Sequence, residues 1–186
     1  MTTEGRTGRP RASSRETLAE AACELFLEQG YERTSVADIA QRAGVSRSSF
    51  FNYFEAKSEV FWAGLDERIA RLGEADDEAD PDAAVRRALA GLGEGFAPDS
   101  LALALLHADA MGLGVEFERD AASRQVRIGH LAADRLRRGG VDPLVADVRG
   151  AAYGGAVAAA LRRWAARPGA SLADAIRVAL AAVPTA

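Results

Sequence analysis

Apolar residues recur with helical spacing along most of this 186-residue chain, and no segment alternates as a half-buried strand does. The first stripe places Leu18, Ala21, Ala22, Leu25 and Phe26 on one face of a helix that ends at a glycine. Similar stripes follow, separated by glycine, proline and helix-capping residues. Ala and Leu dominate the composition, which also favours helix. The pattern predicts an all-α fold of about nine helices.

Caps and breakers set the boundaries of the later helices. Asp80–Pro81 and Asp142–Pro143 each pair an N-cap with proline at the first helical position. Ser171 and Asp174 form a capping box that starts the last helix. The helices predicted after residue 56 cover approximately 57–72, 81–92, 100–111, 115–138, 143–166 and 172–183.

Residues 34–57, TSVADIAQRAGVSRSSFFNYFEAK, read as two short helices around a glycine turn. Ser35 and Asp38 form a capping box, Gly44 ends the first helix, and Ser46 caps a second that runs to Phe54. Two helices joined by a short turn containing glycine make a helix-turn-helix, whose second helix enters the DNA major groove.

The second of these helices has two different faces. Ser48 and Asn52 share one side, whereas Phe50 and Phe54 lie about 160° away. We expect the phenylalanines to pack inward and the polar pair to face outward. Arg47 stands at the helix start, and its guanidinium suits guanine O6 and N7; Asn52 can pair with adenine or contact a phosphate.

The stretch from Arg15 to Phe61 resembles the DNA-binding domain of the tetracycline-repressor (TetR) family of bacterial transcription regulators. The matching positions are 21–22, 25–26, 30–31, 34–36, 39–40, 43–46, the aromatic run 50–54, and 57. Phe51 stands where the family more often has tyrosine, and Tyr53 where histidine is frequent. The spacing on the second helix and the family resemblance together indicate which residues contact DNA. They are Thr34, Ser35, Ser46, Arg47, Ser48, Ser49, Asn52, Tyr53, Lys57 and Arg11.

We expect a flexible basic arm at residues 1–13, a helix-turn-helix domain at 14–56 and a connecting helix at 57–72. An arginine of the arm, such as Arg11, could reach a phosphate or the minor groove, or the arm could be a disordered terminus. The carboxylate-rich segment 73–82 is interpreted as a solvated linker rather than a metal site.

The resemblance implies that residues 83–186 bind a small-molecule effector and dimerise. Expected effector-pocket residues are Trp62, Leu65, Phe96, Leu103, His107, Met111, Phe117, Arg124 and Tyr153, with His107 foremost as the one polar group in an apolar segment. Small residues on the penultimate helix and an apolar stripe on the last suit a four-helix bundle between two copies. The residues expected at that interface are Gly150, Gly154, Ala158, Leu172, Ile176 and Leu180.

The formal net charge of −4 does not exclude DNA binding, because residues 1–57 hold eight basic and eight acidic side chains and the excess lies in the remainder. One cysteine, Cys23, and two separated histidines give no metal motif, and no cofactor is expected. The longest uncharged apolar stretch, 150–161, is too short to cross a membrane.

These observations favour a cytoplasmic, homodimeric repressor that binds an operator in double-stranded DNA and is released by an effector. A DNA-binding regulator without an effector stays open, as does a small all-α enzyme or carrier. The sequence offers few catalytic groups for an enzyme, because its two histidines and single cysteine are scattered.

Overall fold

The computed structural model describes residues 14–72, 80–96 and 99–184. Over these residues the all-helical prediction is confirmed, with nine α-helices, one 3-10 helix and no strand. The elements are α1 (Ser14–Gln29), α2 (Val36–Arg42), α3 (Arg47–Phe51), the 3-10 helix η1 (Lys57–Phe61), α4 (Ala63–Arg71), α5 (Pro81–Gly91), α6 (Asp99–Met111), α7 (Gly114–Arg138), α8 (Pro143–Ala165) and α9 (Leu172–Ala181).

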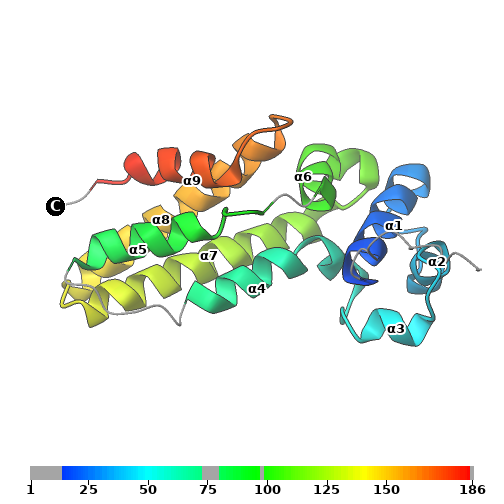
Figure 1. Ribbon diagram of the computed structural model, residues 1–186, viewed down its shortest axis with the longest axis horizontal. Helices are drawn as coiled ribbons and strands as arrows, with labels where there is room; N and C mark the ends of the chain where they lie inside the picture. Colours follow the sequence, from blue (N-terminus) through cyan, green and yellow to red (C-terminus); the bar gives the residue numbers. More distant parts are fainter. Residues whose placement is uncertain (1–13, 73–79, 97–98, 185–186) are drawn as a thin grey trace, which may run out of the picture.

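The helices form two groups along an elongated molecule (Figure 1). Helices α1, α2 and α3 make a small unit at one end, and η1 and α4 lead from it to the larger group. In that group α7 and α8 lie side by side, with α5 and α9 beside them. Apolar side chains of both groups join in one buried core that includes Phe26, Phe61 and Phe117.

The predicted caps that fall on described residues are present. Asp80 accepts hydrogen bonds from the backbone N–H groups of residues 82 and 83, and Asp142 caps α8 in the same way. Ser171 accepts from the N–H of Asp174 at the start of α9, but the Asp174 carboxylate pairs with Arg177, so only half of the predicted capping box is formed. Asp82 thus lies in the first turn of α5 rather than in a linker, and the rest of the acidic segment, 73–79, lies outside the described residues.

Two elements differ from the expected helices. The connecting helix 57–72 is divided, because the tighter 3-10 helix η1 precedes α4 and Trp62 links them. Helix α6 is kinked at His107, which has non-helical backbone angles (φ −121°, ψ 24°). The last residues of α6 reach the unit formed by α1, α2 and α3, where Met111 O accepts from Tyr31 N at 2.7 Å.

The small residues of α8 bring α7 and α8 together within the chain. A Cβ on Gly150 would lie 2.4 Å from Gly129 O, and one on Gly154 would lie 2.4 Å from Gln125 O. Leu172, Ile176 and Leu180 of α9 are likewise buried in the core of the same chain. These five residues, expected at a dimer interface, are therefore used by the fold itself and are not available to a second copy.

Among the described helices, only α8 is long and apolar enough to span a membrane. Its packing accounts for part of that composition, because Tyr153, Val157 and Ala160 are buried against the rest of the fold. Tyr153 donates a hydrogen bond to Asp82 at 2.8 Å, and Arg149 pairs with the same carboxylate at 2.6 Å. A core helix passes the same test, so its hydropathy is no argument for a membrane.

The close contact between α7 and α8 predicts that Gly154→Ala destabilises the protein by about 1–3 kcal/mol, because the new methyl group must push two backbones apart. Gly91→Ala is the matched control, since a Cβ there meets nothing within 4 Å; it should be neutral or stabilising by up to about 1 kcal/mol. The free energy of unfolding in urea measures both. Equal effects of the two substitutions would contradict the observed packing.

Candidate nucleic-acid interface

The turn between α2 and α3 is fixed by local hydrogen bonds. Ser35 accepts from the Asp38 N–H at 3.2 Å while the Asp38 carboxylate accepts from the Ser35 N–H at 2.8 Å, which is the predicted capping box. The Ser35 hydroxyl, which also donates to the Asp38 carboxylate, and the Ser35 N–H both lower the pKa of Asp38. Gly44 has φ +71°, a conformation that costs other residues a steric penalty. Ser46 then caps α3 by accepting from the Ser49 N–H at 3.1 Å.

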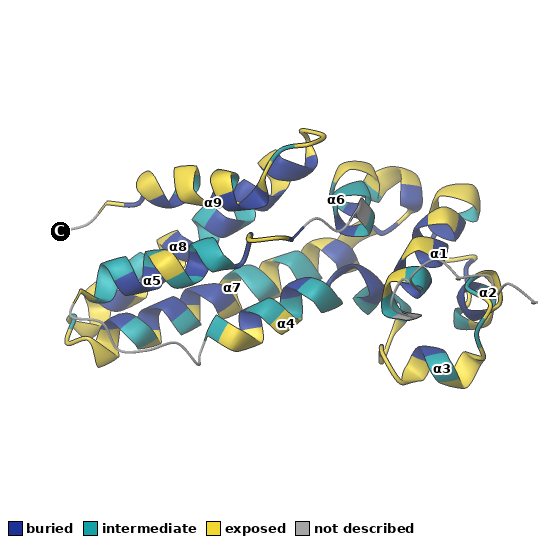
Figure 2. Ribbon diagram, viewed as in Figure 1, coloured by how far each residue is buried: buried dark blue, intermediate teal, exposed yellow. Residues whose placement is uncertain are grey.

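Helix α3 presents the two faces expected from its spacing. Phe50 and Phe54 are 0% and 2% exposed, and their ring centroids lie 5.3 Å apart in the core. Ser48 and Asn52 are exposed, as Figure 2 shows for the outer side of α3. The helix itself is shorter than expected, because it ends at Phe51 and Asn52 is its C-cap.

The exposed face of α3 carries groups that can reach base edges. Arg47 is exposed, forms no hydrogen bond or ion pair with a described residue, and rests its guanidinium 5.7 Å from the Phe51 ring centroid. The hydroxyls of Ser48 and Ser49 each lie 2.8 Å from the Ser46 hydroxyl. These three hydroxyls form a small polar patch at the start of α3.

Tyr53 follows α3 and is 39% exposed, with the Arg15 guanidinium 5.9 Å from its ring centroid. Ser35 is also exposed, and its hydroxyl donates to Asp38 at 2.6 Å. Both lie at the surface of the same small unit as α3. Arg11, the expected contact from the arm, lies outside the described residues.

Thr34 is placed differently from the prediction. Its side chain is only 2% exposed, and its hydroxyl donates to Gly30 O at 2.9 Å and accepts from Gln29 Nε2 at 3.2 Å. The hydroxyl therefore holds the turn after α1 and is not available to a phosphate.

Lys57 is also turned inward. Its ammonium donates to Tyr31 O at 2.7 Å and to Thr34 O at 3.1 Å, and it lies 3.9 Å from the centroid of the Tyr31 ring. The cation thus ties the start of η1 to the turn between α1 and α2. This partly buried position favours a structural role over the phosphate contact that the sequence suggested.

The sequence did not predict one further ion-pair network. Arg42, at the end of α2, contacts Glu24 at 3.0 Å and Glu28 at 2.7 Å, both on α1. The two glutamates are one helical turn apart, which is the only signal the sequence gives. The network fixes α2 on α1 beside the turn that leads to α3.

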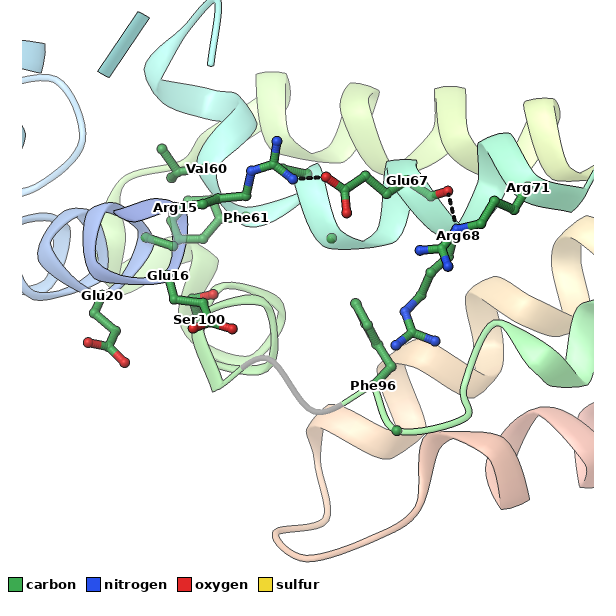
Figure 3. Close-up of a pocket in the computed structure, with 14 residues that line it drawn as sticks. Arg15, Glu16, Glu20, Val60, Phe61, Glu67, Arg68, Arg71, Phe96 and Ser100 are labelled. Atoms are coloured by element: carbon green, nitrogen blue, oxygen red, sulfur yellow. Dashed lines mark hydrogen bonds and ion pairs between the residues drawn. The ribbon is translucent and has the colours of Figure 1, made fainter. Parts of the chain in front are cut away.

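Two of the hollows among the described residues lie beyond the helix-turn-helix. The first is an open cleft of about 560 Å³ between α1, α4 and the turn before α6 (Figure 3). Arg15 and Glu67 form an ion pair across it that joins α1 to α4. Phe96, expected in an effector pocket, lines this cleft with Arg68, whose guanidinium lies 4.9 Å from its ring centroid.

The second hollow is a cavity of about 400 Å³ that we call the apolar cavity. It is lined by Trp62, Leu65, Leu105, Ala108, Phe117, Glu118, Ala121, Ala122, Arg124, Gln125, Ile128, Ala158, Leu161 and Arg162. Four of the expected pocket residues meet there, namely Trp62, Leu65, Phe117 and Arg124. Ala158 lies at the same cavity rather than at a surface between copies.

The other expected pocket residues lie elsewhere. His107 is exposed at the kink of α6, because the kink turns it out of the apolar face. Met111 and Tyr153 are fully buried in the core, and Leu103 is half-buried outside the cavity. Across the described part of the chain, no three histidine, cysteine or acidic side chains are grouped to hold a metal ion.

The geometry of Lys57 predicts that Lys57→Met destabilises the protein by about 1.5–3 kcal/mol even without DNA, because two charge-assisted hydrogen bonds are lost. Arg47→Met removes an exposed cation from the same unit and should stay within about 0.5 kcal/mol of the parent. Urea unfolding of the DNA-free protein measures both. An unaffected Lys57→Met variant would show that the ammonium is free for DNA.

Comparisons with known proteins agree with this geometry. Residues 18–63 match the family model described as "Bacterial regulatory proteins, tetR family". The regulator TtgR of Pseudomonas putida is 37% identical over 90 residues, which are 45% of this chain and 43% of that protein. The chain spans less than half of the length of several curated relatives that it matches.

A solved structure matches nearly the whole chain. The Thermus thermophilus repressor FadR, in complex with lauroyl-CoA, is 30% identical with a TM-score of 0.52, and the match covers 91% of this chain and 92% of that one. These relatives are regulators, which sets the enzyme alternative aside. With its helix-turn-helix at one end and a helical body at the other, the chain belongs to the TetR family of bacterial regulatory proteins.

Proposed function

We propose that this protein is a cytoplasmic, homodimeric transcriptional repressor that binds an operator through α3 and is released from it by a small-molecule effector. The observation that carries the proposal is the exposed polar face of α3 above two buried phenylalanines, inside the segment that matches the family model. Such a helix can enter a major groove without rearrangement.

The contacts divide into two kinds. Arg47, Ser48 and Asn52 face the bases, and Arg47 suits the O6 and N7 atoms of guanine. Ser35, Ser46, Ser49 and Tyr53 lie beside them and suit phosphates, which fix the position of the helix on the duplex. Because the net charge of −4 lies outside residues 1–57, the body does not attract DNA and the contacts must be local.

Two copies are needed for two half-sites, and the exposed side of α8 offers the surface. Leu144, Val148, Ala151, Ala152, Gly155 and Ala159 recur at helical spacing on one side of α8; we call them the α8 stripe. Leu144 and Val148 are 73% and 63% exposed, and Val178 of the neighbouring α9 is 67% exposed. A continuous apolar stripe of this kind suits an isologous contact with a second copy.

The effector step is supported by the apolar cavity and its links to the DNA-binding unit. Leu105 and Ala108, which line the cavity, flank the kink of α6 at His107. Three residues after Ala108, Met111 O accepts from the Tyr31 N–H. A ligand that moves this part of α6 therefore shifts the turn after α1, and a coupling of about 1–3 kcal/mol is typical of such a step.

Base recognition by Arg47 predicts that Arg47→Ala weakens binding to the DNA upstream of its own gene by about 10- to 100-fold and reduces discrimination against unrelated DNA. Arg138→Ala is the matched control, because Arg138 is exposed at the far end of α7. Gel shifts over a salt series measure both, and the parent's affinity should fall steeply as salt rises. Equal losses in both variants would contradict the assignment.

The α8 stripe predicts that Val148→Glu separates the dimer, because two carboxylates would face an apolar surface. The expected mass in sedimentation falls from twice 19.6 kDa to 19.6 kDa. Val115→Glu is the control, since Val115 is 69% exposed at the start of α7, away from the stripe. A Val148→Glu protein that stays dimeric would place the interface elsewhere.

A further inference from the structure

The apolar cavity is open to solvent at Glu118, Ala122 and Arg162, and its size limits how much of a ligand it can cover. Its volume of about 400 Å³ is near the lower end of ligand pockets, which run from about 300 to 1,000 Å³. Liquid water takes about 30 Å³ per molecule, so the cavity has the volume of roughly a dozen water molecules. This suits a two-ring molecule, whereas a whole coenzyme A thioester would have to lie mostly outside.

The wall of the cavity is aromatic and aliphatic. The rings of Trp62 and Phe117 stack with centroids 4.8 Å apart and an angle of 28° between their planes. Leu65, Leu105 and Ile128 complete the apolar lining. Flat apolar molecules gain most from such a wall, because they can bury a whole face against it.

The charged group inside the cavity, Arg124, is already compensated. Arg124 donates to both oxygens of Asp66 at 2.9 and 2.6 Å and to Asp120 O at 3.0 Å, and its guanidinium lies 4.6 Å from the Trp62 ring centroid. Arg162 and Glu118 lie at the exposed edge, where water screens their charges. The buried part of the lining therefore has no uncompensated charge that would select an ionic ligand.

One polar atom at this wall lacks a partner. The indole Nε1 of Trp62 is buried, and no described residue accepts its hydrogen bond. Buried donors are nearly always paired, since an unpaired donor loses its bond to water without compensation. The atom has no surface exposed to the cavity, so the indole must rotate away from its packing on Phe117 before Nε1 can meet a ligand there.

We propose that the apolar cavity binds a compact, uncharged, mainly aromatic molecule that carries one oxygen able to accept a hydrogen bond from Trp62 Nε1. This rests on the proposed function, because it names the chemical class of the effector. The class excludes carboxylates and whole coenzyme A thioesters as preferred ligands. It includes aromatic ketones and phenols of about two rings.

Calorimetry with two probes of nearly equal shape tests the hydrogen bond. 2-Acetylnaphthalene has a carbonyl oxygen that 2-ethylnaphthalene lacks. The ketone should bind the parent about tenfold more tightly, and Trp62→Phe should reduce this ratio to within about twofold because phenylalanine has no donor. Trp164→Phe is the matched control, since Trp164 is buried beside Phe96 and does not line the cavity; it should keep the tenfold ratio.

Ala158→Phe gives a second test that spares Trp62. Ala158 is half-buried on α8 and lines the cavity, so the larger ring should fill it and weaken both probes at least tenfold. Equal binding of the two probes by the parent, or a ratio that persists in Trp62→Phe, would overturn the hydrogen bond. Tighter binding of 2-naphthoate or lauroyl-CoA than of the ketone would overturn the ligand class.

These outcomes are independent of the proposed DNA contact. Gel shifts of the same proteins without ligand report on the operator alone, and calorimetry without DNA reports on the cavity alone. Failure of the probes with normal operator binding would reject the ligand class and leave the DNA-binding function standing. Normal probe binding with no operator binding would do the reverse.

Discussion

Burial of Phe50 and Phe54 is the constraint on which the DNA-binding end depends. Helix α3 has only five residues, and a helix that short is not stable in water by itself. Phe50 within the helix and Phe54 just after it enter the core at 0% and 2% exposure, and this fixes which side of α3 faces outward. The outward position of Arg47, Ser48 and Asn52 is a consequence of that burial. The Ser35–Asp38 box and the ion pairs of Arg42 hold α2 in the matching position.

The same unit is joined to the helical body by the shared apolar core and by several polar contacts. The Tyr31 N–H bonds to Met111 O, Arg15 pairs with Glu67 of α4, and Lys57 holds the turn that contains Tyr31. On the other side, Arg124 of α7 is bound to Asp66 of α4 at the wall of the apolar cavity. Helices α4 and α6 therefore contact both the cavity and the DNA-binding unit.

Local patterns in the sequence predicted local structure well. Helical spacing gave the faces of α3, and the caps at Asp80, Asp142 and Ser171 were each found where the sequence placed them. Contacts between distant segments could not be predicted in this way. Spacing shows that Gly150 and Gly154 share a face of α8 but not that Gly129 of α7 lies against it. Thr34 and Lys57 turn inward because backbone carbonyls of a neighbouring turn accept from them, and His107 turns outward because α6 bends there.

Affinity cleavage of operator DNA tests most directly whether the exposed face of α3 meets the duplex. An iron chelate attached to Ser48→Cys would cut the DNA nearby; Cys23 should stay unlabelled, because burial raises the pKa of its thiol to about 12. The account predicts two clusters of cuts whose centres are about 10–10.5 base pairs, one helical turn, apart. No cleavage from this position, or equal cleavage from a chelate at Arg138→Cys on the far end of α7, would contradict it.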